Sequence, residues 1–376
     1  MVCKIYKSLY GLKQAGRRWN ECFTQFLEPF ILLPMETDHC VYRNKGCNLS
    51  DRTARNVIIA LYVDDGLILS SGRSLIEEVL THLRGAFEVT VGDATSYVGM
   101  QIAIRDSGIT LHQSGYIARK AELLWLPEPT RVSTPLNPSV KYCKSGVVSG
   151  KAEDETRAPY RQLIEAMLYV SNGSRPDVAY AMCSLSRFNS CPKESHWEGA
   201  KRVIRYLKNT QPKWITHTQN EAGLYLDGYS DAYHGGDRDD RESVSGSILL
   251  INGSPVIWKS PKQSKVAGST AVVEFVAVAH DKRDSLGAQL LKRSGREPEA
   301  ATPLLLDNQT AICLISNNQI HAKTKALDLD LLFVRDLHEA EISVSYVSTE
   351  DQFADFLTKQ VEPGQFLSLM KRAVIK

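Results

Sequence analysis

The stretch SVSGSILLINGSPVIWK, residues 243–259, predicts a β-hairpin. Apolar side chains dominate both halves, and the dipeptide Asn252-Gly253 between them strongly favours a tight turn joining antiparallel strands. Just upstream, the run from Leu224 to Ser230 has the composition of another strand. We therefore expect three consecutive strands in this part of the chain.

The residues after the hairpin alternate between helical and strand-like patterns. Helices are predicted at 270–292 and 309–316, and strands at 303–306 and 342–347. The pattern Thr349-x-x-Gln352 is typical of a capping box and predicts the start of a final helix. The order βββαβαβα over residues 222–376 predicts a mixed sheet flanked by helices, and hence an α/β fold.

Four carboxylates fall on different elements of this predicted fold. Asp231 follows the first strand, Asp307 ends the strand at 304–306, Glu274 lies on a helix, and Asp355 lies one turn into the last helix. Carboxylates gathered in this way can hold two divalent ions, one activating a water and the other stabilising a leaving 3′-oxygen. An all-oxygen ligand set suits Mg²⁺. Acidic residues are common at strand ends and helix caps, but the four together favour a phosphodiester-cleaving metal centre.

A second acidic signal lies within the apolar run from Ile58 to Leu69. Asp64, Asp65 and Gly66 predict a tight turn that projects two carboxylates from a hairpin. An ordinary Asp-Asp-Gly turn is the alternative, although a buried hairpin rarely carries paired charges without a use. A polymerase centre also needs a third carboxylate on a neighbouring strand, and no strand precedes Lys7 to carry it.

The remaining patterns predict three domains. Residues 1–126 predict a small palm-like sheet with helices at 17–33 and 74–87 on one face. Prolines are frequent from 127 to 159, which indicates a linker, and 160–209 predicts three helices. The predicted domains are a partial palm at 1–126, a linker and helical thumb or connection at 127–221, and the mixed sheet at 222–376.

Charge and cysteine content limit the cellular setting. A formal charge of +2 over 376 residues is too small to indicate nucleic-acid binding by itself. The basic residues Lys201, Arg202, Arg205 and Lys208 share one predicted helix, where a solvated face is the usual explanation and phosphate contact the alternative. Eight cysteines without C-x-x-C or zinc-like spacing predict free thiols in a reducing compartment. No apolar run of membrane-spanning length and no signal-peptide pattern are present, so we expect an intracellular protein without a membrane partner.

Several ordered blocks resemble copia-type LTR retrotransposon reverse transcriptases. In the first part of the chain these are KSLYGLKQAGRRW at 7–19, LYVDD at 61–65 and YVGMQI at 97–102. The C-terminal part is similar to the ribonuclease H of the same family. Its matching blocks are SDA at 230–232, SVSG at 243–246, WKS at 258–260, DNQ at 307–309 and ADFLTK at 354–359.

The resemblance implies a function for both acidic centres. It implies RNA-directed DNA polymerase ancestry together with endonucleolytic hydrolysis of RNA in RNA–DNA hybrids, within a polyprotein of a transposable element that integrates DNA. Mg²⁺ or Mn²⁺ is the implied cofactor, and template-primer and RNA–DNA hybrid are the implied partners. The implied catalytic and metal-binding residues are Asp64, Asp65, Asp231, Glu274, Asp307 and Asp355. The implied nucleotide- and template-binding residues are Gly11, Lys13, Gln14 and Arg17.

The sequence also departs from the family pattern. Tyr233-His234 stands where the family has Asp-Trp, Val272 replaces a glutamate, and Ala326 replaces a histidine. The family's first polymerase aspartate and its fingers precede the block at 7–19, so we expect the polymerase to be inactive in this chain alone. The alternatives to a ribonuclease H are a non-catalytic nucleic-acid-binding remnant and the product of a translated pseudogene.

Overall fold

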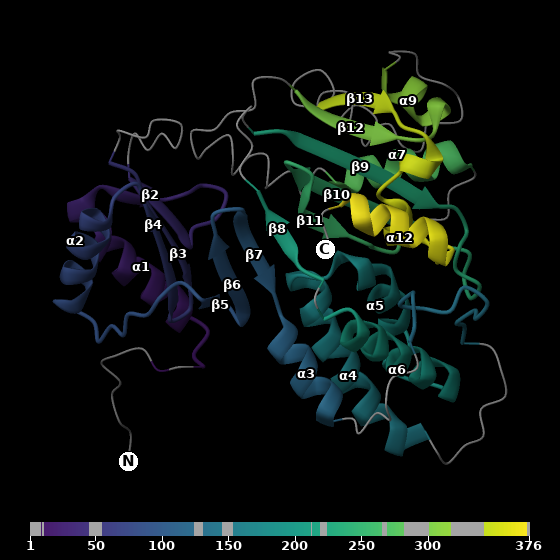
Figure 1. The fold of residues 1–376 in the computed structure, drawn as a ribbon, viewed down its shortest axis with the longest axis horizontal. Helices are drawn as coiled ribbons and strands as arrows, with labels where there is room; N and C mark the ends of the chain where they lie inside the picture. Colours follow the sequence, from purple (N-terminus) through teal and green to yellow (C-terminus); the bar gives the residue numbers. More distant parts are fainter. Residues whose placement is uncertain are drawn as a thin grey trace. The chain divides into compact units, whose positions relative to one another are not determined.

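The fold of the chain was obtained as a computed structural model (Figure 1). The structure describes residues 9, 11–44, 55–123, 131–144, 153–211, 213–218, 224–264, 269–281, 301–316 and 342–373. The chain divides into two compact units, one built on residues up to Gly99 and the other on residues from Met100. The three predicted domains, with boundaries at 126 and 221, remain a prediction.

The first unit is an antiparallel sheet with strand order β1-β2-β3-β4. Its strands are β1 (Leu32–Pro34), β2 (Val41–Asn44), β3 (Val57–Tyr62) and β4 (Asp65–Ser70), and the short β5 (Ser96–Tyr97) follows. Burial alternates along β3, and its buried side chains pack with residues of α1 (Ala15–Leu27) and α2 (Arg73–Arg84) in one core. Both helices therefore cover the same face of this sheet, as the sequence predicts, whereas the strands β6 (Met100–Arg105) and β7 (Gly108–His112) of the predicted palm belong to a separate sheet in the second unit.

The helix predicted at 17–33 is shorter than expected. The α-helix ends at Leu27, a 3-10 turn follows at Glu28–Phe30, and Ile31 adopts a left-handed conformation before β1 begins. Pro29 lacks a backbone N–H and cannot donate the next helical hydrogen bond, which explains why the α-helix stops there.

The second unit begins with three antiparallel strands and a group of helices. The strands are β6 (Met100–Arg105), β7 (Gly108–His112) and β8 (Ile215–His217). The helices are α3 (Ser114–Leu123), α4 (Glu153–Gly173), α5 (Ala179–Ser186) and α6 (Glu194–Asn209), with a 3-10 turn at Pro176–Val178. On the basic face of α6, Lys201 and Arg205 pair with Glu198, and Arg202 donates to Thr134 Oγ1.

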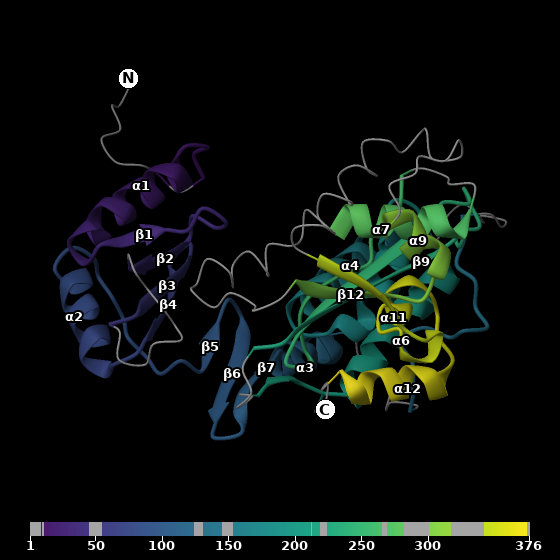
Figure 2. The same ribbon diagram turned by 90° about the horizontal axis from the view of Figure 1, so that it is seen from above.

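The unit continues with a five-stranded mixed sheet of order β11-β10-β9-β12-β13 (Figures 1 and 2). The strands β9 (Leu226–Tyr233), β10 (Val244–Ile251) and β11 (Ser254–Lys259) are antiparallel, whereas β12 (Thr302–Leu306) and β13 (Ile342–Tyr346) run parallel to β9. Asn252 and Gly253 both have positive φ, as a type I′ hairpin turn requires, so the predicted hairpin is confirmed.

Helices cover both faces of this sheet. On one face, Ala232 of β9 packs against Val273 and Ala277 of α7 (Thr270–Asp281), and Leu306 packs with residues of α7 and α9 (Gln309–Ser316). On the other face, Ile248 and Leu250 of β10 share a core with α4, α5, α6, the single-turn helix α11 (Asp355–Thr358) and α12 (Pro363–Arg372). The predicted α/β class, with a mixed sheet flanked by helices, is confirmed.

Two further observations concern membrane-spanning helices and cysteines. Within the described part of the chain, no helix combines the length and the apolar character that crossing a bilayer requires. None of the cysteines that the structure describes forms a disulfide: Cys22, Cys40, Cys143, Cys183, Cys191 and Cys313.

Candidate metal centre

The register between β9 and β12 places two of the predicted carboxylates side by side. Leu305 of β12 is opposite Tyr229 of β9, and the two strands are parallel. Two residues further along each strand lie Asp307 and Asp231. Because side chains in register on adjacent parallel strands point to the same side, the sheet itself brings these two carboxylates together.

The third carboxylate comes from α11, which packs directly on the sheet. Asp231 is opposite Gly246 of β10, and a Cβ at Gly246 would lie 2.6 Å from Thr358 Cγ2 and 2.9 Å from the Ala354 carbonyl oxygen. Only glycine lets the helix approach so closely. This close packing carries Asp355, the first residue of α11, to Asp231.

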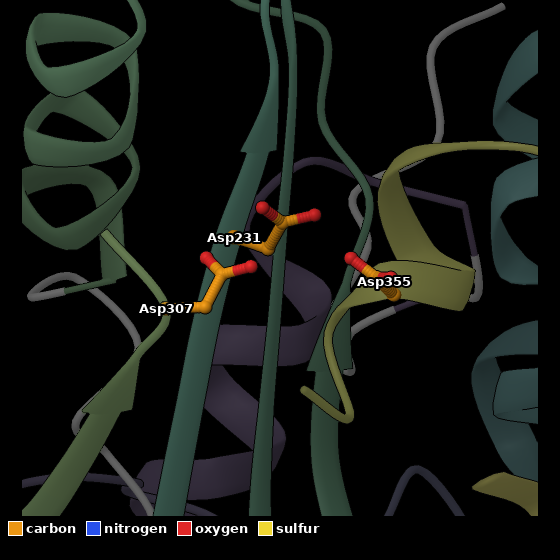
Figure 3. A group of neighbouring side chains, drawn as sticks. All are labelled: Asp231, Asp307 and Asp355. Atoms are coloured by element: carbon orange, nitrogen blue, oxygen red, sulfur yellow. The ribbon is translucent and has the colours of Figure 1, made fainter. Parts of the chain in front are cut away.

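The result is a cluster of three carboxylates, Asp231, Asp307 and Asp355, which we call the carboxylate cluster. One oxygen of each lies within 4.8 Å of the others. Figure 3 shows the three side chains turned toward one another, two from neighbouring strands and one from the short helix. Asp231 and Asp355 are buried and Asp307 is half-buried, so the cluster is largely removed from water.

Glu274 reaches the same region from α7. Its side chain is buried, and its Oε1 accepts a hydrogen bond from Asn308 Nδ2 at 3.0 Å. Its other oxygen, Oε2, is buried without a hydrogen-bond partner among the described residues. A buried carboxylate oxygen without a donor is costly unless a cation or a proton satisfies it.

The crowding of negative charge changes the pKa values of these groups. Burial, and then the charge of Asp231, raise the pKa of Asp355 to about 7. Burial also raises the pKa of Glu274 to about 7, with the charges of Asp231 and Asp307 adding to the effect. Burial followed by the charge of Asp231 raises the pKa of Asp307. Raised carboxyl pKa values are expected where several carboxylates are buried close together.

Three neighbours that the sequence analysis left without a role hold the cluster in place. Thr358 Oγ1 donates to Asp231 Oδ2 at 2.6 Å, and Gln365 Nε2 donates to Asp355 Oδ2 at 3.1 Å. Lys359 Nζ lies 2.6 Å from Asp355 Oδ1 and 3.8 Å from Asp231 Oδ2. Burial disfavours the ammonium of Lys359, but the charges of Asp231 and Asp355 outweigh burial and raise its pKa. The block ADFLTK at 354–359 was the available signal for Thr358 and Lys359.

The predicted capping box at Thr349 and Gln352 is wrong. Residues 349–351 form a 3-10 turn without a side-chain cap, and Thr349 Oγ1 donates to Asp307 Oδ2 at 3.0 Å. Gln352 Nε2 instead donates to the Ser230 carbonyl oxygen at 3.0 Å. Asp355 therefore opens the single-turn helix α11 and does not lie on the last helix, which is α12. The two polar side chains tie this segment to the strand ends that carry Asp231 and Asp307.

Two of the family departures lie two residues from a predicted ligand: Tyr233 follows Asp231 and Val272 precedes Glu274. Tyr233 is exposed at the end of β9. Val272 is partly buried and packs on the core formed by α7, α9 and β12. Ala326 lies outside the described residues.

The turn that carries Asp64 and Asp65 lies one residue earlier than predicted. Tyr62 is opposite Asp65, so Val63 and Asp64 form the turn and Asp65 begins β4. Val63 has a φ of 57°, which is uncommon for a β-branched residue, and Trp19 Nε1 donates to its carbonyl oxygen at 2.9 Å. Asp64 and Asp65, which we call the turn pair, are both exposed. Among the described residues, neither belongs to a group of three side chains able to ligate a metal.

The residues predicted to contact nucleotide or template lie at the start of α1. Gly11, with a φ of 91°, Lys13 and Gln14 precede the helix, and Arg17 is in its first turn. All four are exposed, and Arg17 Nε lies 2.7 Å from Glu21 Oε1. Trp19 joins this end of α1 to the turn pair through its bond to Val63.

The residues present fit a divalent metal ion. The carboxylate cluster offers three oxygens within a few ångströms, and Glu274 Oε2 is a fourth buried oxygen without a partner among the described residues. Oxygen donors of this kind suit the hard ions Mg²⁺ and Mn²⁺. Compensation of the buried negative charge is what the site requires.

Comparison with known proteins gives matches over nearly the whole chain. Residues 1–138 match the family described as "Reverse transcriptase (RNA-dependent DNA polymerase)". The Pol polyprotein of transposon TNT 1-94 from Nicotiana tabacum is 32% identical over 97% of this chain and 28% of its own length. The putative transposon Ty5-1 protein of Saccharomyces cerevisiae is 32% identical over 69% of this chain and 82% of its own length.

A solved structure also aligns with part of the chain. LC11-RNase H1, isolated from compost, is 12% identical over 36% of this chain and 92% of its own, with a TM-score of 0.29. The chain spans about a quarter of the length of the curated plant relatives it matches. The chain belongs to the family of copia-type retrotransposon Pol polyproteins, and its residues 1–138 correspond to a reverse transcriptase region.

Proposed function

We propose that the carboxylate cluster and Glu274 form a ribonuclease H centre that hydrolyses the RNA strand of RNA–DNA hybrids. The observation that carries the proposal is the convergence of Asp231, Asp307 and Asp355 within 4.8 Å from three separate elements. These three side chains, with Glu274, would hold Mg²⁺ or Mn²⁺. The bound ions supply an activated water and stabilise the leaving 3′-oxygen.

The protein's own side chains hold the ligands and keep water out. Thr358 and Gln365 each fix one oxygen of a cluster carboxylate and so restrict the orientation of Asp231 and Asp355. Asn308 fixes Glu274 Oε1 and leaves Oε2 for a ligand. Buried, oriented ligands of this kind need little reorganisation when charge develops in the transition state.

We propose that the reverse transcriptase portion descends from an RNA-directed DNA polymerase and binds template-primer. We also propose that this chain alone does not polymerise DNA. The turn pair is exposed and, among the described residues, has no third ligand beside it. Gly11, Lys13, Gln14 and Arg17 would contact nucleotide or template at the same end of α1. Incubation of the purified chain with template-primer and Mg²⁺ is expected to give no extension. Extension that Asp64→Asn abolishes would overturn this part of the proposal.

The free cysteines support a location in a reducing, intracellular compartment. Nucleic acid is the proposed partner in both portions. Tyr233 and Val272 depart from the family pattern, and these departures favour a second candidate function. This candidate is a nucleic-acid-binding protein that does not cleave.

The test is Mn²⁺-dependent cleavage of an end-labelled RNA–DNA hybrid by the full chain. Wild type is expected to cleave, and Asp231→Asn is expected to lose cleavage because the central ligand is removed. Asp227→Asn is the matched control, since Asp227 lies on the same strand, outside the cluster. Cleavage that persists in Asp231→Asn would refute the centre, and hybrid binding with Mn²⁺ bound but no cleavage would favour the second candidate.

A further inference from the structure

Lys359 places a positive charge inside the carboxylate cluster. Its Nζ lies 2.6 Å from Asp355 Oδ1 and 3.8 Å from Asp231 Oδ2, and only about a third of its side chain is exposed. The lysine follows α11 directly, and its backbone N–H donates to the Asp355 carbonyl oxygen at 3.2 Å. The ammonium therefore lies between the two buried aspartates of the cluster.

Besides contacting each other, the two aspartates accept hydrogen bonds from neutral donors among the described residues. Asp231 Oδ2 accepts from Thr358 Oγ1, and Asp355 Oδ2 accepts from Gln365 Nε2. Among the described residues, no other ion pair is formed by Asp231 or Asp355. Lys359 is thus the group that compensates the buried charge of this pair.

The same position is the one that a divalent ion needs. Mg²⁺ binds carboxylate oxygens at roughly 2.1 Å. A divalent ion held by Asp231 and Asp355 would therefore lie close to this ammonium, and like charges repel strongly in a poorly solvated site. The four-carbon stem of lysine is flexible enough to withdraw the charge toward solvent.

We propose that Lys359 is a resident counter-cation, which holds the Asp231–Asp355 pair together without metal and must leave it when a divalent ion binds. This inference rests on the proposed metal-dependent function of the cluster. Lys359 is a positioning residue, and its charge lowers the affinity of the centre for metal. In the metal-free protein, the same contact reduces the repulsion between the carboxylates of Asp231 and Asp355.

The first test measures Mn²⁺ binding by electron paramagnetic resonance in the full chain after metal removal. Lys359→Gln is expected to bind Mn²⁺ at least about tenfold more tightly than wild type, because a nearby positive charge is gone. Metal-free Lys359→Gln is expected to melt at a lower temperature than metal-free wild type. Addition of Mn²⁺ is expected to raise the melting temperature of the variant more than that of wild type. Lys359→Arg keeps the charge and is expected to stay near wild type.

Lys262→Gln is the matched control. Lys262 also pairs with carboxylates, but with Asp237, Asp240 and Glu242, outside the cluster. Its loss is expected to lower the melting temperature without changing Mn²⁺ affinity. Asp231→Asn, which removes a ligand, shows whether the bound Mn²⁺ is at the cluster.

The outcomes separate this inference from the proposed function. Equal or weaker Mn²⁺ binding by Lys359→Gln, with binding retained in wild type, would overturn the counter-cation and leave the metal centre standing. Failure of both proteins to bind Mn²⁺ would remove the proposed function and the inference together.

A second measurement uses wild type alone and does not depend on the folding of a variant. The reactivity of Lys359 toward an amine-acylating reagent is followed by mass spectrometry, with and without Mn²⁺. Release of the ammonium from the aspartates is expected to increase the acylation of Lys359 several-fold. Unchanged or reduced acylation at saturating Mn²⁺ would overturn the proposal.

Discussion

The two acidic centres of the chain contain the same kind of side chain in opposite surroundings. The turn pair lies exposed on a hairpin of the first unit, with no third ligand beside it among the described residues. The carboxylate cluster is largely buried and is assembled from two strands and a helix of the second unit. Exposed aspartates are stable without a cation, whereas buried ones require compensation. Burial and convergence therefore distinguish a site that requires a cation from an exposed turn that is stable without one.

One ion pair from each unit shows the same contrast between buried and exposed surroundings. Arg175 and Asp177 in the second unit are completely buried and share two hydrogen bonds, at 2.9 and 2.7 Å, and Tyr206 also donates to Asp177. Arg17 and Glu21 in the first unit form an exposed pair on α1. Two ion pairs with similar distances are therefore expected to contribute very differently to the free energy of unfolding.

The largest expected effect is the loss of the buried pair. Asp177→Asn leaves the Arg175 charge buried without its partner and is expected to cost about 3–5 kcal/mol of unfolding free energy. Glu21→Gln is the matched change in the first unit and is expected to leave the free energy of unfolding nearly unchanged, because the pair is solvated. Urea unfolding followed by circular dichroism measures both. Similar losses of unfolding free energy for the two variants would show that burial does not decide how much an ion pair contributes.

The next effect concerns the close packing of α11 on β10. Gly246→Val places side-chain atoms where Thr358 and Ala354 lie, and overpacking of this kind is expected to cost about 1–3 kcal/mol. Displacement of α11 also moves Asp355 away from Asp231, so Mn²⁺ binding is expected to fall. Gly364→Ala in α12, where a Cβ meets open space, is the control. Mn²⁺ affinity unaffected by Gly246→Val would mean that α11 does not position the centre.

A smaller effect is the pH dependence of the metal-free centre. The pKa values of Asp355 and Glu274 are raised to about 7, so folding disfavours their charged forms. Stability without metal is expected to decrease as pH rises from about 4 to about 7, and Mn²⁺ affinity is expected to increase over the upper part of this range. Thermal unfolding in a chelator and in Mn²⁺, at pH 5.5 and pH 8, gives both trends. Asp355→Asn is expected to weaken both trends. Higher stability at pH 8 than at pH 5.5 in the presence of the chelator would contradict the raised pKa values.

The smallest effect is expected at the start of α1. If Lys13 and Arg17 contact phosphate, the double change Lys13→Ala and Arg17→Ala reduces the slope of log affinity against log salt by roughly 2. The expected loss of hybrid affinity is modest because both side chains are solvated. An unchanged salt slope would leave these residues as surface charges.

Much of the mixed sheet could be predicted from the sequence because its signals are local. Asn252-Gly253 fixed the hairpin position, and the apolar runs gave the strands that end near Asp231 and Asp307. Glu274 was placed correctly on a helix. In each case a short stretch of sequence carries the structural preference without help from distant residues.

The errors arose where tertiary contacts decide the local conformation. Val63 occupies a turn position that its branched side chain disfavours, and the Trp19 indole donates to its carbonyl oxygen from 44 residues away. Thr349 bonds to Asp307 instead of capping a helix. The place of Lys359 depends on the packing of α11 against Gly246, which no local pattern encodes.

The most direct test of the difference between the two centres is an Mn²⁺ titration of three purified proteins, followed by electron paramagnetic resonance. These are wild type, Asp231→Asn, and the double variant Asp64→Asn with Asp65→Asn. We predict that Asp231→Asn loses the tight Mn²⁺ site and that the double variant binds as wild type does. Loss of Mn²⁺ binding in the double variant, with Asp231→Asn unaffected, would contradict the account.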